Sequence, residues 1–301
     1  MTDAPDLAIA AAPAIATEPA GPTRRRASSV WWLVAPLAVI VMVALAAPLL
    51  PLPDPGQQDL AARFQAPVWD TGDWAHALGT DHLGRDVLSR LIHGARLTFA
   101  IAVAGVLIAG GVGTVLGILA GYRRGWADHV VTRLVDAQLA LPFMLLSMAV
   151  IASSGRSLAV LVLVLATYGW AQYARVLRAE TMSLRTRPFI LGLRAAGASS
   201  ARIMVAHIMP NVTNSFLVIA TFEVGTMILG EGALSFLGLG VVSPQVSWGL
   251  MLAEGRDHLA RAWWVVAFPG LAIATVVLLT NLLGDSLRVL YDPRHRGDAR
   301  S

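Results

Sequence analysis

The sequence lacks cysteine and lysine completely, and these absences exclude several kinds of chemistry. Without cysteine there is no disulfide, no thiolate metal ligand and no cysteine nucleophile. All 23 basic residues are arginine. A phosphate-binding loop of the GxxxxGK[ST] type needs a lysine on the nucleotide phosphates, so this chain cannot contain one. If ATP drives this protein, we expect another chain to hydrolyse that ATP.

Charged residues are also scarce. They make up 14% of the chain, against roughly 25% in soluble domains, while 56% of the residues are hydrophobic. Together with a mean hydropathy of +0.63, this composition predicts a membrane protein. A net charge of +4 is compatible with nucleic-acid binding, but most of the arginines lie in short segments between apolar runs. This placement favours membrane lipid over nucleic acid as a partner.

Six apolar runs follow one another along the chain, at 30–50, 97–121, 129–152, 157–175, 212–230 and 262–287. Their lengths suit helices that cross a bilayer. The first run opens with Trp31-Trp32, as expected at a membrane surface. The alternative for this run is a signal peptide cleaved after Ala44-Leu45-Ala46, which the long preceding tail disfavours. The sequence therefore predicts an all-α integral membrane protein with six transmembrane helices.

The arginines predict how these helices are oriented. Those near both termini, in the second connection and in the fourth connection fall by parity on one side, and fewer fall opposite. Arginine-rich connections stay in the cytoplasm, so both termini are expected there. The predicted divisions are a disordered cytoplasmic tail (1–29), a first transmembrane helix (30–50), an extracytoplasmic segment (51–95), a core of five transmembrane helices (96–287) and a cytoplasmic C-terminal tail (288–301).

The segment 189–211, FILGLRAAGASSARIMVAHIMPN, is a long polar stretch between apolar runs. Its arginines can satisfy anionic lipid headgroups at the membrane surface. Alternatively, the segment is a short helix pair presented to a cytosolic partner, because its central run of small residues permits a sharp turn. Ser199 or Ser200 then caps a second short helix at 201–208, and Pro210 suits the first turn of the next span.

This segment resembles the cytoplasmic coupling loop of ABC importer permeases. The family pattern is Glu-Ala-Ala, three residues, Gly, nine residues, then Ile-x-Leu-Pro. Gly197 and the closing His207-Ile208-Met209-Pro210 match it, whereas Leu191-Gly192-Leu193 stand where Glu-Ala-Ala is expected. Further segments resemble the C-type permease of dipeptide, oligopeptide and nickel importers: GTDHLGRDVLSRLIHGAR (79–96), RLVDAQLALP (133–142), ALSFLGLG (233–240) and NLLGDSLRVLYDPR (281–294).

The resemblance implies a permease subunit with the ABC type I importer fold in the bacterial cytoplasmic membrane. It implies a peptide substrate, and as partners a second related permease, one or two cytosolic ATPase subunits and an extracytoplasmic solute-binding protein. The partner ATPases would use ATP and magnesium, whereas this chain would bind no cofactor and catalyse no reaction. The residues expected to contact the ATPase are Arg194, Ala195, Ala196, Gly197, Ala198, Ser199, Arg202, His207 and Pro210.

Two other functions remain open at this point. One is an ABC importer permease for nickel or another small solute, because selectivity in such systems lies largely in the binding protein. The other is a stand-alone secondary transporter, which often carries an internal repeat and ion-coupling residues near the membrane midplane. The sequence has no convincing internal repeat, which disfavours the second alternative.

A few polar residues within or beside the spans are candidates for the translocation path. Glu223, in the fifth run, either lines that path or hydrogen-bonds a neighbouring helix. Glu231, at the outer end of the run, is a second candidate, with anchoring of the following loop as the favoured role. The seven histidines have no metal-binding spacing, so no metal site is predicted. The glycines of the second run, which include Gly113 and Gly117, predict close helix packing within the bundle or against the partner permease.

Overall fold

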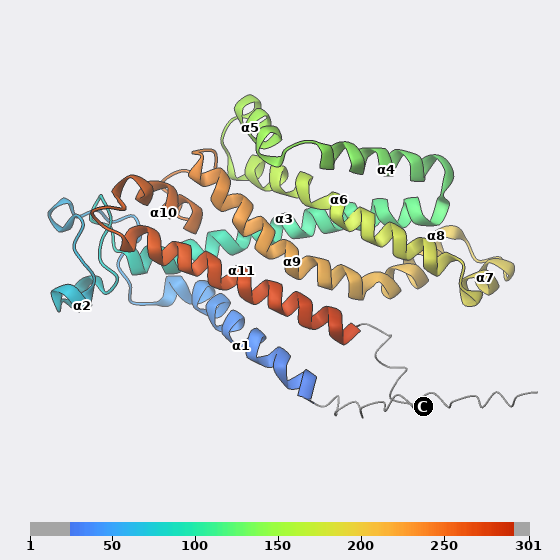
Figure 1. Ribbon diagram of the computed structural model, residues 1–301, viewed down its shortest axis with the longest axis horizontal. Coiled ribbons are helices and arrows are strands. Elements are labelled where there is room, and N and C mark those ends of the chain that lie inside the picture. Colours follow the sequence, from blue (N-terminus) through green and yellow to red (C-terminus); the bar gives the residue numbers. More distant parts are fainter. Residues whose placement is uncertain (1–24, 292–301) are drawn as a thin grey trace, which may run out of the picture.

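The structure is a computed structural model that describes residues 25–291, and within this range it is a bundle of helices without strands (Figure 1). Five helices are long and apolar enough to cross a membrane, and a sharply bent pair makes a sixth candidate span. The candidate spans are α1 (Arg25–Ala46), α3 (Val87–Arg123), α6 (Leu158–Arg185), α9 (Met209–Phe236) and α11 (Trp264–Tyr291), and the bent pair is α4 (Gly125–Ala140) with α5 (Phe143–Ser154).

Shorter elements lie at the two ends of the bundle (Figure 1). At one end are α2 (Val68–Thr71) and α10 (Trp248–Gly255), and at the other end are α7 (Pro188–Ala195) and α8 (Ser200–Arg202). The beginning of α1 and the end of α11 lie toward the α7 end, as expected from six spans (Figure 1). We refer to these below as the α10 end and the α7 end.

The predicted third span is not one straight helix. Its residues form α4 and α5, whose axes differ by 93°, and the break falls at Leu141 and Pro142. Proline disfavours helical backbone in the preceding residue, and Leu141 is accordingly extended, with φ −89° and ψ 130°. The apolar run at 129–152 predicted the location of this segment but neither its exact bounds nor its change of direction.

Two predicted boundaries also differ from the structure. Helix α1 begins at Arg25, so residues 25–29 are helical instead of part of a disordered tail; residues 1–24 and 292–301 lie outside the described range. Helix α3 begins at Val87, ten residues before the predicted start at 97. The carboxylate of Asp86 accepts a hydrogen bond from the backbone N–H of Ser89 and caps this first turn. The hydropathy pattern missed the ten residues before 97 because several of them are polar.

Helix α3 packs most extensively against α6, and three glycines make this contact close. Gly113, Gly117 and Gly121 follow at intervals of four residues and face the backbone of α6. A Cβ atom on Gly113 would lie 2.4 Å from the carbonyl oxygen of Trp170, closer than nonbonded atoms can approach. The predicted packing role of the glycines in this run is therefore seen within the chain, between α3 and α6.

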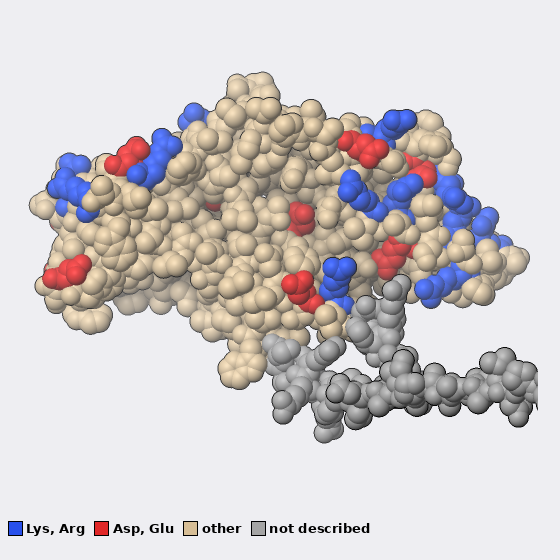
Figure 2. All heavy atoms as spheres, viewed as in Figure 1, with Lys and Arg blue, Asp and Glu red and all other residues tan. Residues whose placement is uncertain are grey.

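Charged side chains gather toward the two ends of the bundle, and the band between them is almost entirely uncharged (Figure 2). Arginine predominates at the α7 end in this view, with several side chains close together (Figure 2). This distribution agrees with an apolar band in the bilayer and with two charged faces in water.

Candidate coupling site

The predicted coupling loop is a projecting turn at the α7 end. Helix α7 begins with Pro188 and ends at Ala195, and the chain then reverses at Gly197, which adopts a left-handed backbone with φ +81°. Glycine is the residue that enters this conformation without strain. The hydroxyl of Ser199 accepts a hydrogen bond from the backbone N–H of Arg202, at 3.3 Å, and caps α8. The sharp turn and the serine cap agree with the local geometry predicted from the small residues.

The second half of the loop differs from the prediction. A separate helix was expected at 201–208, but residues 200–236 are continuously helical, with a π-helical segment at Ile203–Ile208 between α8 and α9. Proline has no backbone N–H, and its ring crowds the preceding turn of an α-helix. The wider turn before Pro210 accommodates this ring, so the loop passes into α9 without a break.

Buried isoleucines fix the loop to the bundle. Ile190, Ile203 and Ile208 are fully buried, and they belong to one apolar cluster with Ile118 of α3 and Leu177 of α6. The loop is therefore packed directly against α3, α6 and α9. Because protein interiors are close-packed, a displacement of the loop would also displace these helices.

The remaining predicted coupling residues cover the outer surface of the turn. Arg194 and Arg202 are exposed, and neither forms an ion pair with a described residue. Ala198 and His207 are half-buried, whereas the others are exposed: Ala195, Ala196, Gly197, Ser199 and Pro210. All nine predicted residues are therefore at least partly exposed, and their contact with an ATPase stays a prediction.

Glu223 lies inside the bundle of this chain. Its side chain is 8% exposed and faces α6, where a Cβ atom on Gly169 would lie 3.0 Å from its Oε2 atom. This oxygen is buried and accepts no hydrogen bond from the described residues. The hydroxyl of Tyr173, also on α6, is likewise buried without a partner. The role of Glu223 in the translocation path stays a prediction.

We expect Glu223→Gln to lower solute uptake several-fold while thermal stability stays equal or rises. An unsatisfied buried polar group costs about 1–3 kcal/mol, so the Glu223 carboxylate does not stabilise the fold and replacing it should not lower stability. The measurement pairs uptake into proteoliposomes with thermal unfolding of the same preparation. Unchanged uptake would remove Glu223 from the path.

Glu231 is fully buried and bonded at the α10 end of α9. Its Oε1 atom accepts hydrogen bonds from the hydroxyls of Ser235, at 2.7 Å, and Ser247, at 2.8 Å. Ser247 also caps α10 by accepting a hydrogen bond from the N–H of Leu250. These contacts tie the segment before α10 to α9, the geometry that the loop-anchoring interpretation requires. Its tentative place in the translocation path stays a prediction.

A buried ion cluster at the α10 end was not identified from the sequence. Arg85 donates to Asp81 and to Glu254, both at 2.7 Å, and Arg90 pairs with the same two carboxylates. Burial opposes ionisation of Asp81, but Arg90, Arg85 and two backbone N–H groups outweigh it and hold its pKa below the ordinary value. The cluster joins the segment that precedes α3, and the first turn of α3, to Glu254 on α10. Its other three members lie within the 79–96 segment that carried part of the resemblance.

Among the described residues, one group of side chains at this cluster has a spacing that could hold a metal ion. Ligand atoms of Asp81, His82 and Glu254 lie within 4.8 Å of one another. Both carboxylates are already engaged by arginine, which disfavours a cation there. Burial lowers the pKa of His82, and its ring stacks on that of His258 at 5.2 Å. The arrangement fits a structural clamp.

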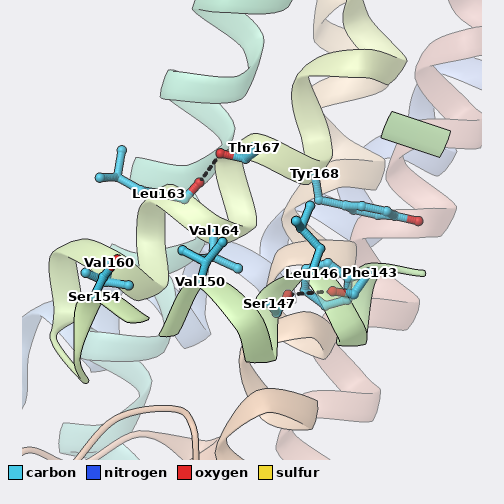
Figure 3. A pocket seen from close by; sticks show the side chains of 10 residues that line it. All are labelled: Phe143, Leu146, Ser147, Val150, Ser154, Val160, Leu163, Val164, Thr167 and Tyr168. Carbon is cyan, nitrogen blue, oxygen red and sulfur yellow. Dashed lines mark hydrogen bonds between the residues drawn. The ribbon is translucent and has the colours of Figure 1, made fainter. Parts of the chain in front are cut away.

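A cavity of about 170 Å³ between α5 and α6 has little capacity for polar recognition (Figure 3). The hydroxyls of Ser147 and Thr167 donate to carbonyl groups of their own helices, those of Phe143 and Leu163 (Figure 3). Most of the other lining residues are apolar. We therefore interpret this cavity as a packing gap between α5 and α6. Neither Glu223 nor Glu231 lines it.

These features define a multi-pass membrane protein with a rigidly mounted surface loop. Residues 113–297 match the family described as the binding-protein-dependent transport system inner membrane component, and the chain belongs to this family. It is 42% identical over 264 residues to a di/tripeptide transport system permease protein of Pseudomonas aeruginosa, covering 87% of each chain. It is 38% identical to a dipeptide permease of Alkalihalophilus pseudofirmus (84% of this chain, 82% of the relative). A glutathione transport system permease of Pectobacterium atrosepticum is 41% identical, over 73% of each chain.

Membership of this family confirms the predicted resemblance to ABC importer permeases and the multi-pass location in the bacterial inner membrane. The match covers α4 to α11 and the C-terminal end of α3 from residue 113 onward, including the coupling loop and α9. The departure at Leu191-Gly192-Leu193 therefore lies inside a chain that otherwise fits its family.

Proposed function

We propose that this chain is one half of the membrane path of an ATP-driven importer of short peptides. The α7 end faces the cytoplasm, where arginine-rich ends of membrane proteins are retained, and the α10 end faces outward. A second permease completes the path, a solute-binding protein delivers the substrate from outside, and one or two ATPase subunits dock on the α7 end. The printed functions of the relatives, which are di/tripeptide, dipeptide and glutathione transport, support a short peptide substrate.

The observation that carries this proposal is the mounting of the coupling loop. Its outer surface is exposed, while its isoleucines are buried against α3, α6 and α9. Movement of a bound ATPase pushes the loop as one piece with these helices, and the bundle changes between two global states. The chain itself cannot supply a lysine to nucleotide phosphates, so the hydrolysis occurs on its partners.

The complete transporter in proteoliposomes tests this function. With ATP inside and the binding protein outside, dipeptides are expected to accumulate, whereas nickel ions are not. Uptake of nickel without peptide uptake would support the small-solute alternative. Transport by this chain alone, driven by an ion gradient without ATP, would overturn the proposal.

Reversing the charge of both Arg194 and Arg202 to glutamate should reduce substrate-stimulated ATP hydrolysis at least tenfold. Removing one partner of a charge pair that is buried at an interface weakens binding by about 2–5 kcal/mol. This loss exceeds the roughly 1.4 kcal/mol that corresponds to a tenfold effect. The matched control reverses Arg123 and Arg288, which are exposed near the same end but outside the loop. Intact coupling in the loop variant would show that docking depends on neither charge.

A further inference from the structure

A cavity of about 390 Å³ at the α7 end is lined by three arginines and no carboxylate. Its walls come from the corner between α3 and α4, from the end of α6 and from α7, and its lining residues are Arg124, Met182, Arg185, Thr186, Leu191 and Arg194. We call this cavity the arginine pocket. None of its three arginines forms an ion pair within residues 25–291.

A contact within the fold orients one of these arginines, Arg185. The guanidinium of Arg185 lies over the ring of Tyr122, with its Cζ atom 5.8 Å from the ring centroid. The Nη1 atom of Arg185 is buried and has no hydrogen-bond partner among the described residues. Arg124 occupies the corner after α3 with a left-handed backbone, φ +60°. A guanidinium that is held against an aromatic ring and lines a cavity is a prepared partner for a planar anion.

We propose that the arginine pocket receives an aspartate or glutamate side chain of the ATPase subunit. Resting on the function proposed above, this inference specifies the chemistry of that contact. A carboxylate would accept paired hydrogen bonds from a guanidinium and offset the mutual repulsion of three cations. Leu191 contributes an apolar wall to the pocket, at the position where the family pattern has glutamate. The loop therefore offers no carboxylate at this position to neutralise the arginines.

The position of the pocket along α6 favours a protein ligand over a lipid headgroup. The apolar run of this span ends at Arg175, and Arg185 lies ten residues further along the same helix. Ten helical residues span about 15 Å. The headgroup region on one side of a bilayer is only roughly 5–8 Å thick. The pocket therefore lies beyond the headgroups, beside the exposed side chains of Phe189 and Leu191, which a protein surface would cover.

Binding of the purified ATPase to the permease pair in nanodiscs tests this inference. Arg185→Gln should weaken binding about tenfold, and Arg185→Lys should weaken it less, because lysine keeps the charge but loses the planar fork. Arg123→Gln is the matched control, since Arg123 is exposed and does not line the pocket; it should change binding less than twofold. If Arg185→Gln impairs folding, Arg124→Gln at the exposed rim gives the same comparison.

Three results separate the explanations. Equal binding by the Arg185→Gln and Arg123→Gln variants would overturn the inference while leaving the proposed function intact. A loss confined to phosphatidylglycerol nanodiscs and absent from phosphatidylcholine nanodiscs would identify a lipid headgroup as the occupant and would also overturn it. A wild-type permease that binds no ATPase would overturn the proposed function itself. In support, changing one ATPase carboxylate to its amide should show no additional loss in the Arg185→Gln background.

Discussion

Replacing Asp81 with alanine should lower the free energy of unfolding by about 3–5 kcal/mol, one of the two largest effects that we expect in this chain. Asp81 and Glu254 balance the charges of Arg85 and Arg90, and three of these four side chains are almost fully buried. Without Asp81, two buried guanidinium groups share one carboxylate. The cost comes from an unpaired charge that cannot reach water.

Thermal unfolding of the detergent-solubilised permease pair measures this effect, and hydrogen exchange locates it. Protection should be lost first around residues 79–91 and in α10, because the cluster joins these two segments. Asp257→Ala is the matched control: Asp257 is 76% exposed and lies 3.4 Å from Arg256, so its removal should cost less than about 1 kcal/mol. Equal stability of the two variants would show that the cluster contributes no more than a surface pair.

The same cluster predicts that the free energy of unfolding falls as the pH is lowered. Because the pKa of Asp81 is lowered in the fold, its contribution is present above pH 3.8 and is lost as the pH falls through its lower folded value. Burial also lowers the pKa of His82, so the stability from keeping it neutral declines as the pH falls below 6.5. In Asp81→Asn, the part of the low-pH loss that Asp81 causes should disappear, while the loss caused by His82 remains.

The sequence was sufficient where a local pattern determines the structure. Apolar runs of bilayer length predicted the candidate spans, and the small residues at 195–200 predicted the turn and a serine cap that shape the coupling loop. Leu141 and Pro142 mark a bend that a hydropathy profile does not resolve, because hydropathy averages over direction.

Contacts between distant segments could not be predicted in this way. Arg85 and Glu254 are separated by 169 residues, and neither lies in a pattern that identifies the other. The arginine pocket has the same origin, since the corner between α3 and α4, the end of α6 and α7 each contribute one part of it. The proposed translocation path is a further case, because the proposed second permease would contribute a surface that this chain does not contain.

The contact between α3 and α6 connects the coupling loop to the membrane and sets the second large prediction. Gly113→Leu should destabilise the protein by more than about 3 kcal/mol, because overpacking a close interface forces backbone movement. The first added carbon would lie 2.4 Å from the carbonyl oxygen of Trp170 and 2.5 Å from Cβ of Tyr173. Neither atom belongs to a flexible side-chain end, so the helices must separate.

Gly111 supplies the control on the same helix, two residues away. It is exposed, and no atom lies within 4 Å of an added Cβ there. Gly111→Ala should therefore stabilise the helix by up to about 1 kcal/mol, the difference in helix propensity, whereas Gly113→Ala should destabilise the protein. Thermal unfolding measures both signs, and substrate-stimulated ATP hydrolysis should fall only in the Gly113 variants. Equal shifts at the two positions would contradict a close α3–α6 contact and, with it, a rigid connection from the loop to the spans.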